Sequence, residues 1–253
     1  MKRALNRYRP AIRLLIPAPA RSFLKRAARK LTRQRVKAIR WGDLRRTEPV
    51  SPDWGFERGT PVDRYYIERF LEQNRRDIRG RVLEVLEPRY TTMFGSGVTY
   101  SEVVHVEEGY PQTTVVADLS DGEGLTSDHY DCVILTQTLQ CIPDTGAAVR
   151  TLHRILKPGG VVLATIPTIT RISRYDMDRW GDYWRMTTRG ARYFFDPVFD
   201  DDVVVEAFGN VLVATAFLHG VAAEELTSDE LSVVDPDFEF LVAVRARKGS
   251  SRR

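Results

Sequence analysis

The ends of three short apolar segments in the middle of the chain carry acidic residues with the spacing of a nucleoside-binding site. Glu84 lies in the first of several short apolar segments, with Glu87 just after it, while Glu107 ends the second segment. A carboxylate in this second position can accept hydrogen bonds from both ribose hydroxyls, as an acid does about 20 residues on in dinucleotide-binding folds. Asp118 closes the third segment and is placed to accept from an adenine amine, with Leu119 against the ring. Single acids at strand ends are often only solvated, so the prediction depends on their joint placement.

A strand, a helix and a second strand are predicted to position this site. Residues 131–136 and 161–166 are short apolar runs, and residues 145–156 repeat apolar side chains at helical spacing. Asp144 can cap the helix, and the 157–160 turn leads into the second strand. This order makes a parallel βαβ unit. In an open sheet of this kind, ligands bind beyond the carboxyl ends of the strands.

The other apolar segments extend the same sheet. Thr136 and Gln137 come at the end of the strand 131–136, so we expect them to line the floor of the site. A helix is predicted from a Thr60 cap and a Pro61 first residue through Ile78. The remaining predicted strands are 81–86, 102–107, 113–117, 203–208 and 238–246.

Residues 80–167 resemble the class I S-adenosylmethionine-dependent methyltransferases in the order of their motifs. Residues 82–86 are similar to the family's first strand, residues 104–107 to its ribose-binding strand and residues 116–119 to its adenine-binding segment. The resemblance implies an α/β fold: a Rossmann-like seven-stranded methyltransferase sheet with helices on both faces. It also implies S-adenosyl-L-methionine as the cofactor. The residues expected at the cofactor are Tyr65, Glu84, Glu87, Tyr90, Glu107, Asp118, Leu119, Thr136 and Gln137.

The turn after the first predicted strand departs from this family. Leu86, Pro88 and Tyr90 stand where glycines are expected, and Gly95 and Gly97 come late. Without glycines the backbone cannot approach the cofactor in the usual way. We therefore expect a different pocket for the methionine end, with Tyr90 facing the sulfonium, and a short or missing helix after this strand. The missing glycines also keep open a non-catalytic, nucleoside-binding scaffold domain.

Three further segments resemble a bacterial subgroup whose members often accompany glycosyltransferases and are thought to methylate sugars or glycans. They are residues 58–68, 136–140 and 174–185. This resemblance implies an O-methyltransferase that acts on a hydroxyl of a sugar, an oligosaccharide or a glycan precursor. A small natural product or a nucleic acid stays open as the acceptor. A nicotinamide dehydrogenase is disfavoured because no glycine fingerprint follows the first strand.

The segment from about 169 to 190 is dense in aromatic, acidic and arginine side chains. Sugars offer apolar ring faces and many hydroxyls, so their sites commonly pair aromatic platforms with carboxylates and arginine. An alcohol acceptor also needs its proton removed, which a general base accelerates roughly 10²–10⁴-fold. The candidate bases are Asp178, Asp182 and His219. A divalent metal such as Mg²⁺ could join these Asp residues to sugar hydroxyls, but the sequence has no specific spacing of metal ligands. The expected acceptor-binding residues are Tyr175, Asp176, Trp180, Tyr183, Trp184 and Arg185.

Charge divides the 253-residue chain into two parts. Residues 1–42 carry 14 Lys and Arg and no Asp or Glu, so the rest is acidic although the net charge is +4. We expect residues 1–46 to form a basic, partly helical arm and residues 47–249 to form the methyltransferase domain, with the acceptor-binding insertion inside it. The positive charge of the arm favours binding to a membrane surface with anionic lipids or to an acidic partner. The acidic body disfavours nucleic acid, because it offers no evident track for phosphates.

The cysteine content and the hydropathy point to a reducing compartment. Only Cys132 and Cys141 occur, so a disulfide framework is not expected. The apolar run 11–16 is far too short to span a bilayer. We expect a cytoplasmic protein that lies at the membrane periphery if the arm binds lipid, and a homo-oligomer stays open.

Overall fold

The computed structural model describes residues 39–200 and 202–250. The chain divides into two units, Met1–Arg45 and Arg46–Arg253. In the first unit the described residues hold one 3₁₀ turn, η1 (Gly42–Leu44). The predicted basic helix over 21–41 and most of the predicted arm lie outside the described residues. None of the helices in the described ranges has the length and apolar composition that a membrane span needs.

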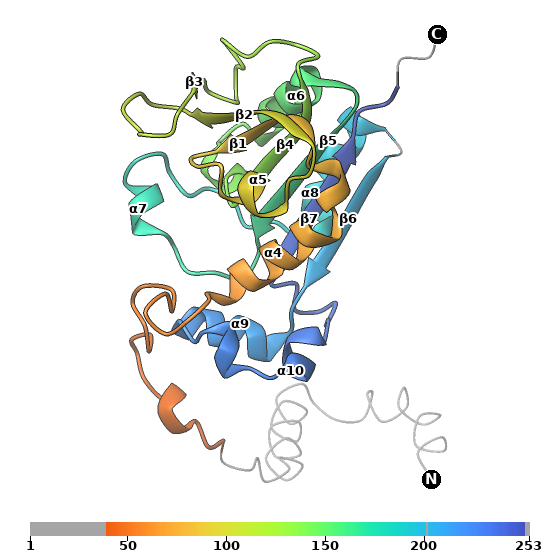
Figure 1. Cartoon of the computed structure of the whole chain (residues 1–253). Coiled ribbons are helices and arrows are strands. Elements are labelled where there is room, and N and C mark those ends of the chain that lie inside the picture. Colours follow the sequence, from red (N-terminus) through yellow and green to blue (C-terminus); the bar gives the residue numbers. More distant parts are fainter. Residues whose placement is uncertain (1–38, 201, 251–253) are drawn as a thin grey trace, which may run out of the picture. The chain divides into compact units, whose positions relative to one another are not determined.

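The second unit is built on a seven-stranded sheet with the order β3-β2-β1-β4-β5-β7-β6. Neighbouring strands are parallel from β3 through to β5, whereas β7 is antiparallel to both β5 and β6. β3 and β6 form the two edges of the sheet (Figure 1). The strands are β1 (Gly80–Val85), β2 (Val98–His105), β3 (Val115–Val116), β4 (Tyr130–Thr136), β5 (Leu156–Pro167), β6 (Val203–Phe208) and β7 (Leu241–Arg247).

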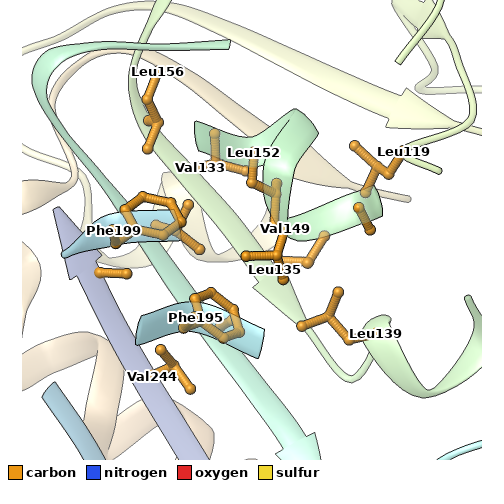
Figure 2. Packing of buried hydrophobic residues seen from close by; sticks show 14 of the residues in the cluster. Leu119, Val133, Leu135, Leu139, Val149, Leu152, Leu156, Phe195, Phe199 and Val244 are labelled. Carbon is orange, nitrogen blue, oxygen red and sulfur yellow. The ribbon is translucent and has the colours of Figure 1, made fainter. Parts of the chain in front are cut away.

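Helices cover both faces of the sheet because the central strands are apolar on both sides. In β4, Val133 and Leu135 point to one face and Cys132 and Ile134 to the other. The first face packs against α6 (Thr145–Ile155) and α8 (Thr188–Phe199). Figure 2 shows this layer, with Phe195 and Phe199 between the helices and the strands. The second face packs against α4 (Val62–Gln73), α5 (Arg89–Phe94) and α9 (Val211–His219).

Short elements complete the unit between the main helices and strands. Two 3₁₀ turns follow α4 and β4, and another one lies after α9. The short helix α7 falls in the segment between β5 and α8, and α10 precedes β7. Their bounds are η2 (Arg75–Asp77), η3 (Leu139–Cys141), α7 (Arg174–Met177), η4 (Ala223–Glu225) and α10 (Ser228–Ser232).

The predicted fold class is confirmed, and helix capping shows where local prediction succeeded and failed. Asp144 caps α6, since its carboxylate accepts from the Ala147 amide at 2.8 Å. The prediction for Thr60 was wrong: the cap of α4 is Pro61, without a side-chain bond. The Thr60 hydroxyl instead donates to Glu224 at 2.6 Å. The helix also ends at Gln73 rather than at residue 78, because the chain tightens into a 3₁₀ turn there.

Two strand ends also differ from the prediction. β2 ends at His105, two residues before the expected end at Glu107. β5 begins at Leu156 and includes the 157–160 turn, which appears as a register shift opposite Tyr130. The first of these differences decides which side chains reach the carboxyl edge of the sheet.

Candidate active site at the carboxyl ends of the strands

A cavity of about 650 Å³ lies at the carboxyl ends of β1, β2, β4 and β5. Sites for small ligands and cofactors commonly measure about 300–1,000 Å³. Residues from the start of α4, from the segment after β3 and from residues 169–185 complete its wall. The predicted site residues that line it are Glu84, Glu87, Tyr90, Asp118, Leu119, Thr136, Gln137, Tyr175, Asp176, Trp180, Asp182 and Arg185.

The turn after β1 is tight even though it has no glycine. Leu86 has a φ of 71°, the left-handed conformation that glycine usually provides. Its amide donates to the Val104 carbonyl at 3.2 Å, and the Glu87 amide donates to the Val85 carbonyl at 2.9 Å. A left-handed conformation costs a residue with a Cβ roughly 1–2 kcal/mol. The chain therefore keeps the sharp turn at the cost of local strain.

Glu84 holds the short helix after this turn. Its buried carboxylate accepts from the amides of Tyr90 at 2.9 Å and Thr91 at 2.8 Å, and from the Thr91 hydroxyl at 2.7 Å. Burial raises the pKa of Glu84 in spite of these bonds. The six residues of α5 confirm the predicted short helix. Glu84 lines the cavity, but its hydrogen bonds serve the start of α5.

Gln137 forms the floor beyond β4 and is also in an unusual conformation. Its φ is 48°, and its amide donates to the Thr165 carbonyl at 3.0 Å. The Nε2 atom of Gln137 and the Oε1 atom of Gln140 are buried without a hydrogen-bond partner in the described ranges. Unsatisfied buried polar groups are costly in a folded protein. These two atoms are suited to hydrogen bonds with a ligand in the cavity.

Strained residues gather at this cavity. Five residues other than glycine have positive φ in the described part of the chain, and three of them, Trp54, Leu86 and Gln137, line the cavity. Such conformations cluster at functional sites, where the surrounding structure maintains them. Their concentration here supports a binding role for the cavity.

Asp118 and Leu119 occupy the place expected for an adenine subsite. One oxygen of Asp118 accepts from the Ser120 amide at 2.7 Å, and Leu119 is buried. His105 ends β2 beside them, with its Nδ1 accepting from the Glu107 amide at 3.0 Å. The His105 ring centroid lies 3.6 Å from that of Tyr110. A carboxylate, an apolar side chain and an aromatic ring therefore line this end of the cavity.

Two of the expected cofactor residues do not line the cavity. Glu107 is exposed, because β2 ends two residues earlier and His105 takes the lining position. Tyr65 packs edge-to-face on Tyr66, with a centroid distance of 5.0 Å. Arg64 lines the cavity instead. Adjacent residues of a helix point about 100° apart, so a one-residue error in helical phase explains the difference.

Residues 175–185 contribute an ion pair and an aromatic cluster to the wall of the cavity. Arg185 donates to both oxygens of Asp182, at 2.5 and 2.7 Å, and the Asp182 side chain is 3% exposed. The Trp180 ring lies edge-on to His105 and to Tyr175, with centroid distances of 5.4 and 5.7 Å. Its indole nitrogen is buried without a partner in the described residues. This wall therefore combines charged, aromatic and hydrogen-bonding groups.

Four other predicted residues do not line the cavity. Asp178 is exposed at the end of α7, and Tyr183 is exposed as well. Trp184 donates through its indole to the Ile142 carbonyl at 3.0 Å. His219 was expected in an insertion that reaches the pocket, but it is the last residue of α9, and its carbonyl accepts from the Ser51 amide at 3.0 Å. The apolar α9 packs against the sheet through Val213 and Phe217, and the half-buried His219 at its end does not line the cavity.

The sequence did not single out several residues that the cavity brings together. Asp63 and Arg64 come from the start of α4, and burial raises the pKa of Asp63. The Arg171 guanidinium lies 3.9 Å from the ring centroid of Trp54 and donates to the Pro52 carbonyl at 2.5 Å. Asp63 and Arg64 lie within the 58–68 segment, and Arg171 lies just before the 174–185 segment, but neither pattern shows which side chains face inward.

The cavity fits an adenosyl amino acid in its size and its polar groups. Asp118 and Leu119 suit a base, and the unpartnered amide of Gln137 suits a polar group above the floor. Among the described residues, no group of three or more His, Cys, Asp or Glu side chains could hold a metal ion.

Residues 56–199 match a family model described as a methyltransferase domain. This match covers more than half of the chain, which therefore belongs to the methyltransferase domain family. The chain is an S-adenosylmethionine-dependent methyltransferase, with S-adenosyl-L-methionine as its cofactor. No curated protein matches the sequence.

Solved structures agree with this fold. The cyclase SpnF is 15% identical, with a TM-score of 0.50 over 77% of this chain and 84% of its own. A SAM-dependent methyltransferase from Archaeoglobus fulgidus is 13% identical, with a TM-score of 0.49 over 73% of this chain and 94% of its own. An S-adenosylmethionine-dependent methyltransferase from Mesorhizobium loti is 17% identical, with a TM-score of 0.47 over 74% and 98%. At these identities the likeness concerns the fold.

Proposed function

We propose that the enzyme transfers a methyl group to a hydroxyl of a sugar, an oligosaccharide or a glycan precursor. The observation that carries this proposal is the wall formed by residues 169–185. There the aromatic side chains of Tyr175 and Trp180 stand beside the Asp182–Arg185 ion pair in one cavity. Aromatic rings suit the apolar faces of a sugar, and the charged pair suits its hydroxyls.

The cavity residues divide into a cofactor side and an acceptor side. S-adenosyl-L-methionine supplies an activated methyl group when bound. Asp118 and Gln137 hold the nucleoside, while Trp180 and Tyr175 orient the acceptor over the strand ends. Holding two reactants in line can contribute roughly 7–11 kcal/mol toward lowering the barrier. Alignment by these side chains is therefore the main catalytic contribution that we assign to the protein.

Asp182 is our candidate for the group that accepts the acceptor's proton. Of the three bases that the sequence suggested, it alone lines the cavity. A carboxylate offers about four lone-pair sites. Arg185 occupies two of them, and the Ser173 amide donates to a third at 3.4 Å. The remaining site can accept a hydroxyl proton while Arg185 fixes the direction of the carboxylate.

The test combines cofactor binding with a screen of acceptors. Calorimetry should show micromolar binding of S-adenosylhomocysteine, about −8 kcal/mol. Incubation of the enzyme with cofactor and a panel of saccharides should release S-adenosylhomocysteine with at least one of them. Turnover of small phenols or of RNA but of no saccharide would refute the sugar proposal. A failure to bind the cofactor analogue would favour a scaffold.

Asp182→Asn has a matched control in Asp178→Asn. Both residues belong to the same segment, but the control residue is exposed and does not line the cavity. We expect the Asp182 variant to lower kcat roughly 10²-fold or more, as loss of a general base does. The control should keep its turnover. Equal effects of the two substitutions would remove Asp182 from the reaction.

A further inference from the structure

The β1 turn has few backbone donors left for a ligand. The amides of Leu86, Glu87 and Thr92 donate to backbone carbonyls. Those of Tyr90 and Thr91 donate to Glu84, and Pro88 has no N–H group. A carboxylate that approaches this turn therefore finds five amides already used. A side chain must provide the donors that a glycine-rich turn would offer through its backbone.

Arg64 is the arginine in the cavity wall that is best placed to provide them. Arg185 is paired with Asp182, Arg89 with Glu68, and Arg171 donates to the Pro52 carbonyl. In the described part of the chain, the Arg64 guanidinium forms no ion pair within 4.0 Å. An unpaired guanidinium at the wall of a partly buried cavity favours binding of an anion, because pairing offsets its desolvation.

Tyr90 holds this guanidinium beside the β1 turn. Nη1 of Arg64 donates to the Tyr90 hydroxyl oxygen at 3.0 Å. Tyr90 is 3% exposed, lies in α5 and comes four residues after Leu86. Burial raises the pKa of Tyr90, so its phenol stays neutral and accepts this bond near pH 7. The contact joins α4 to α5, and it leaves other N–H groups of the guanidinium for a ligand.

We propose that Arg64, held by Tyr90, binds the carboxylate of the methionine end of S-adenosyl-L-methionine. The side chain takes over the role of backbone donors in a turn that lacks glycine. The proposal rests on cofactor use by this cavity, and it is independent of the acceptor. It predicts that affinity depends on the amino acid part of the ligand specifically through Arg64.

A comparison of two ligands isolates this contact. S-adenosylhomocysteine carries the amino acid carboxylate, whereas 5′-methylthioadenosine lacks it and keeps the nucleoside. Calorimetry on the full chain should show that Arg64→Ala weakens S-adenosylhomocysteine binding roughly 10–100-fold, the range for a hydrogen-bonded charge. Binding of 5′-methylthioadenosine should change less than about 3-fold. Equal losses for both ligands, or no loss for either, would overturn the proposal.

Further variants separate this contact from a general loss of structure. Arg64→Lys keeps the charge but loses the bidentate geometry of the guanidinium. Its affinity for S-adenosylhomocysteine should therefore lie between those of the wild type and the alanine variant. Tyr90→Phe should weaken the binding of S-adenosylhomocysteine but not of 5′-methylthioadenosine, because it releases the Arg64 guanidinium from its hydrogen bond without removing it. Arg69→Ala, on an exposed position of the same helix, should bind both ligands as the wild type does. Failure of the wild type to bind either nucleoside would instead refute the methyltransferase function.

Discussion

The left-handed conformation of Leu86 allows a test in which the usual order of stability of a glycine and an alanine substitution reverses. At most positions glycine is less stable than alanine by about 0.5–1 kcal/mol, because it loses more backbone entropy on folding. Leu86 has a φ of 71° and is 47% exposed. Here alanine keeps the left-handed conformation and its strain, whereas glycine removes the strain. We therefore expect Leu86→Gly to be more stable than Leu86→Ala.

The magnitude follows from three contributions. Both substitutions lose the half-buried leucine side chain, which costs about 1 kcal/mol in each variant and cancels in the comparison. Glycine relieves roughly 1–2 kcal/mol of conformational strain and loses about 0.5–1 kcal/mol through entropy. The free energy of unfolding of the glycine variant should therefore exceed that of the alanine variant by about 0.75 kcal/mol, the difference between the central values. In a domain of this size this difference raises Tm by about 1–4 °C.

Urea unfolding of the two variants and the wild type measures this difference. Val106 serves as the control position, because it also lies just beyond a strand end, is 45% exposed and has no positive φ. Val106→Ala should be more stable than Val106→Gly, the ordinary order. If Leu86→Gly were no more stable than Leu86→Ala, the turn would carry no left-handed strain, and our account of the glycine-poor loop would be wrong.

Two further predictions concern titratable groups at the cavity. Burial raises the pKa of Asp63, so the folded state binds its proton more tightly than the unfolded state does, and stability should fall as pH rises from about 4 through the raised pKa. Asp63→Asn should remove this decline, and urea midpoints between about pH 4 and pH 7 measure it; an unchanged slope would show that the carboxyl is solvated. Burial also raises the pKa of the Cys141 thiol to about 12, and Cys132 is buried, so a thiol reagent at about pH 8 should react with the native protein far more slowly than with the unfolded chain. Rapid modification of the native protein would contradict this placement of Cys141.

The sheet was accessible to sequence analysis because its pattern is strong. The uncharged apolar run 132–135, within the predicted strand 131–136, has few alternatives to a buried strand. Asp144 before a clear helical period was recognised as a cap for a similar reason. Of the three acids whose joint placement carried the site prediction, Glu84 and Asp118 line one cavity, whereas Glu107 does not. Patterns that repeat over several residues were therefore reliable.

The details of the site depend on features that a single sequence does not express. A two-residue shift of the end of β2 decides whether Glu107 lines the cavity. The sequence carries no strong signal for the exact residue at which a strand ends. A one-residue change in the phase of α4 decides whether Tyr65 or Arg64 lines the cavity. The sign of φ at Leu86 is set by the tight turn and not by a preference of leucine. His219 was misplaced because α9 is apolar on nearly all sides and has no clear period.

In one wall of the cavity, residues 51–60 at the beginning of the domain contact residues 219–224 near its end. The Ser51 amide binds the His219 carbonyl, and Thr60 binds Glu224. A side chain at Gly55 would come within 2.8 Å of the Gly220 carbonyl oxygen, so the two backbones fit closely. Trp54 and Phe56, which line the cavity, lie within the segment held by these contacts. During synthesis this wall lacks its contacts with residues 219–224 until those residues have left the ribosome, and until then Arg171 holds it through Trp54 and Pro52. A nascent chain that stops after the matched family region would therefore present a pocket with an incompletely supported wall.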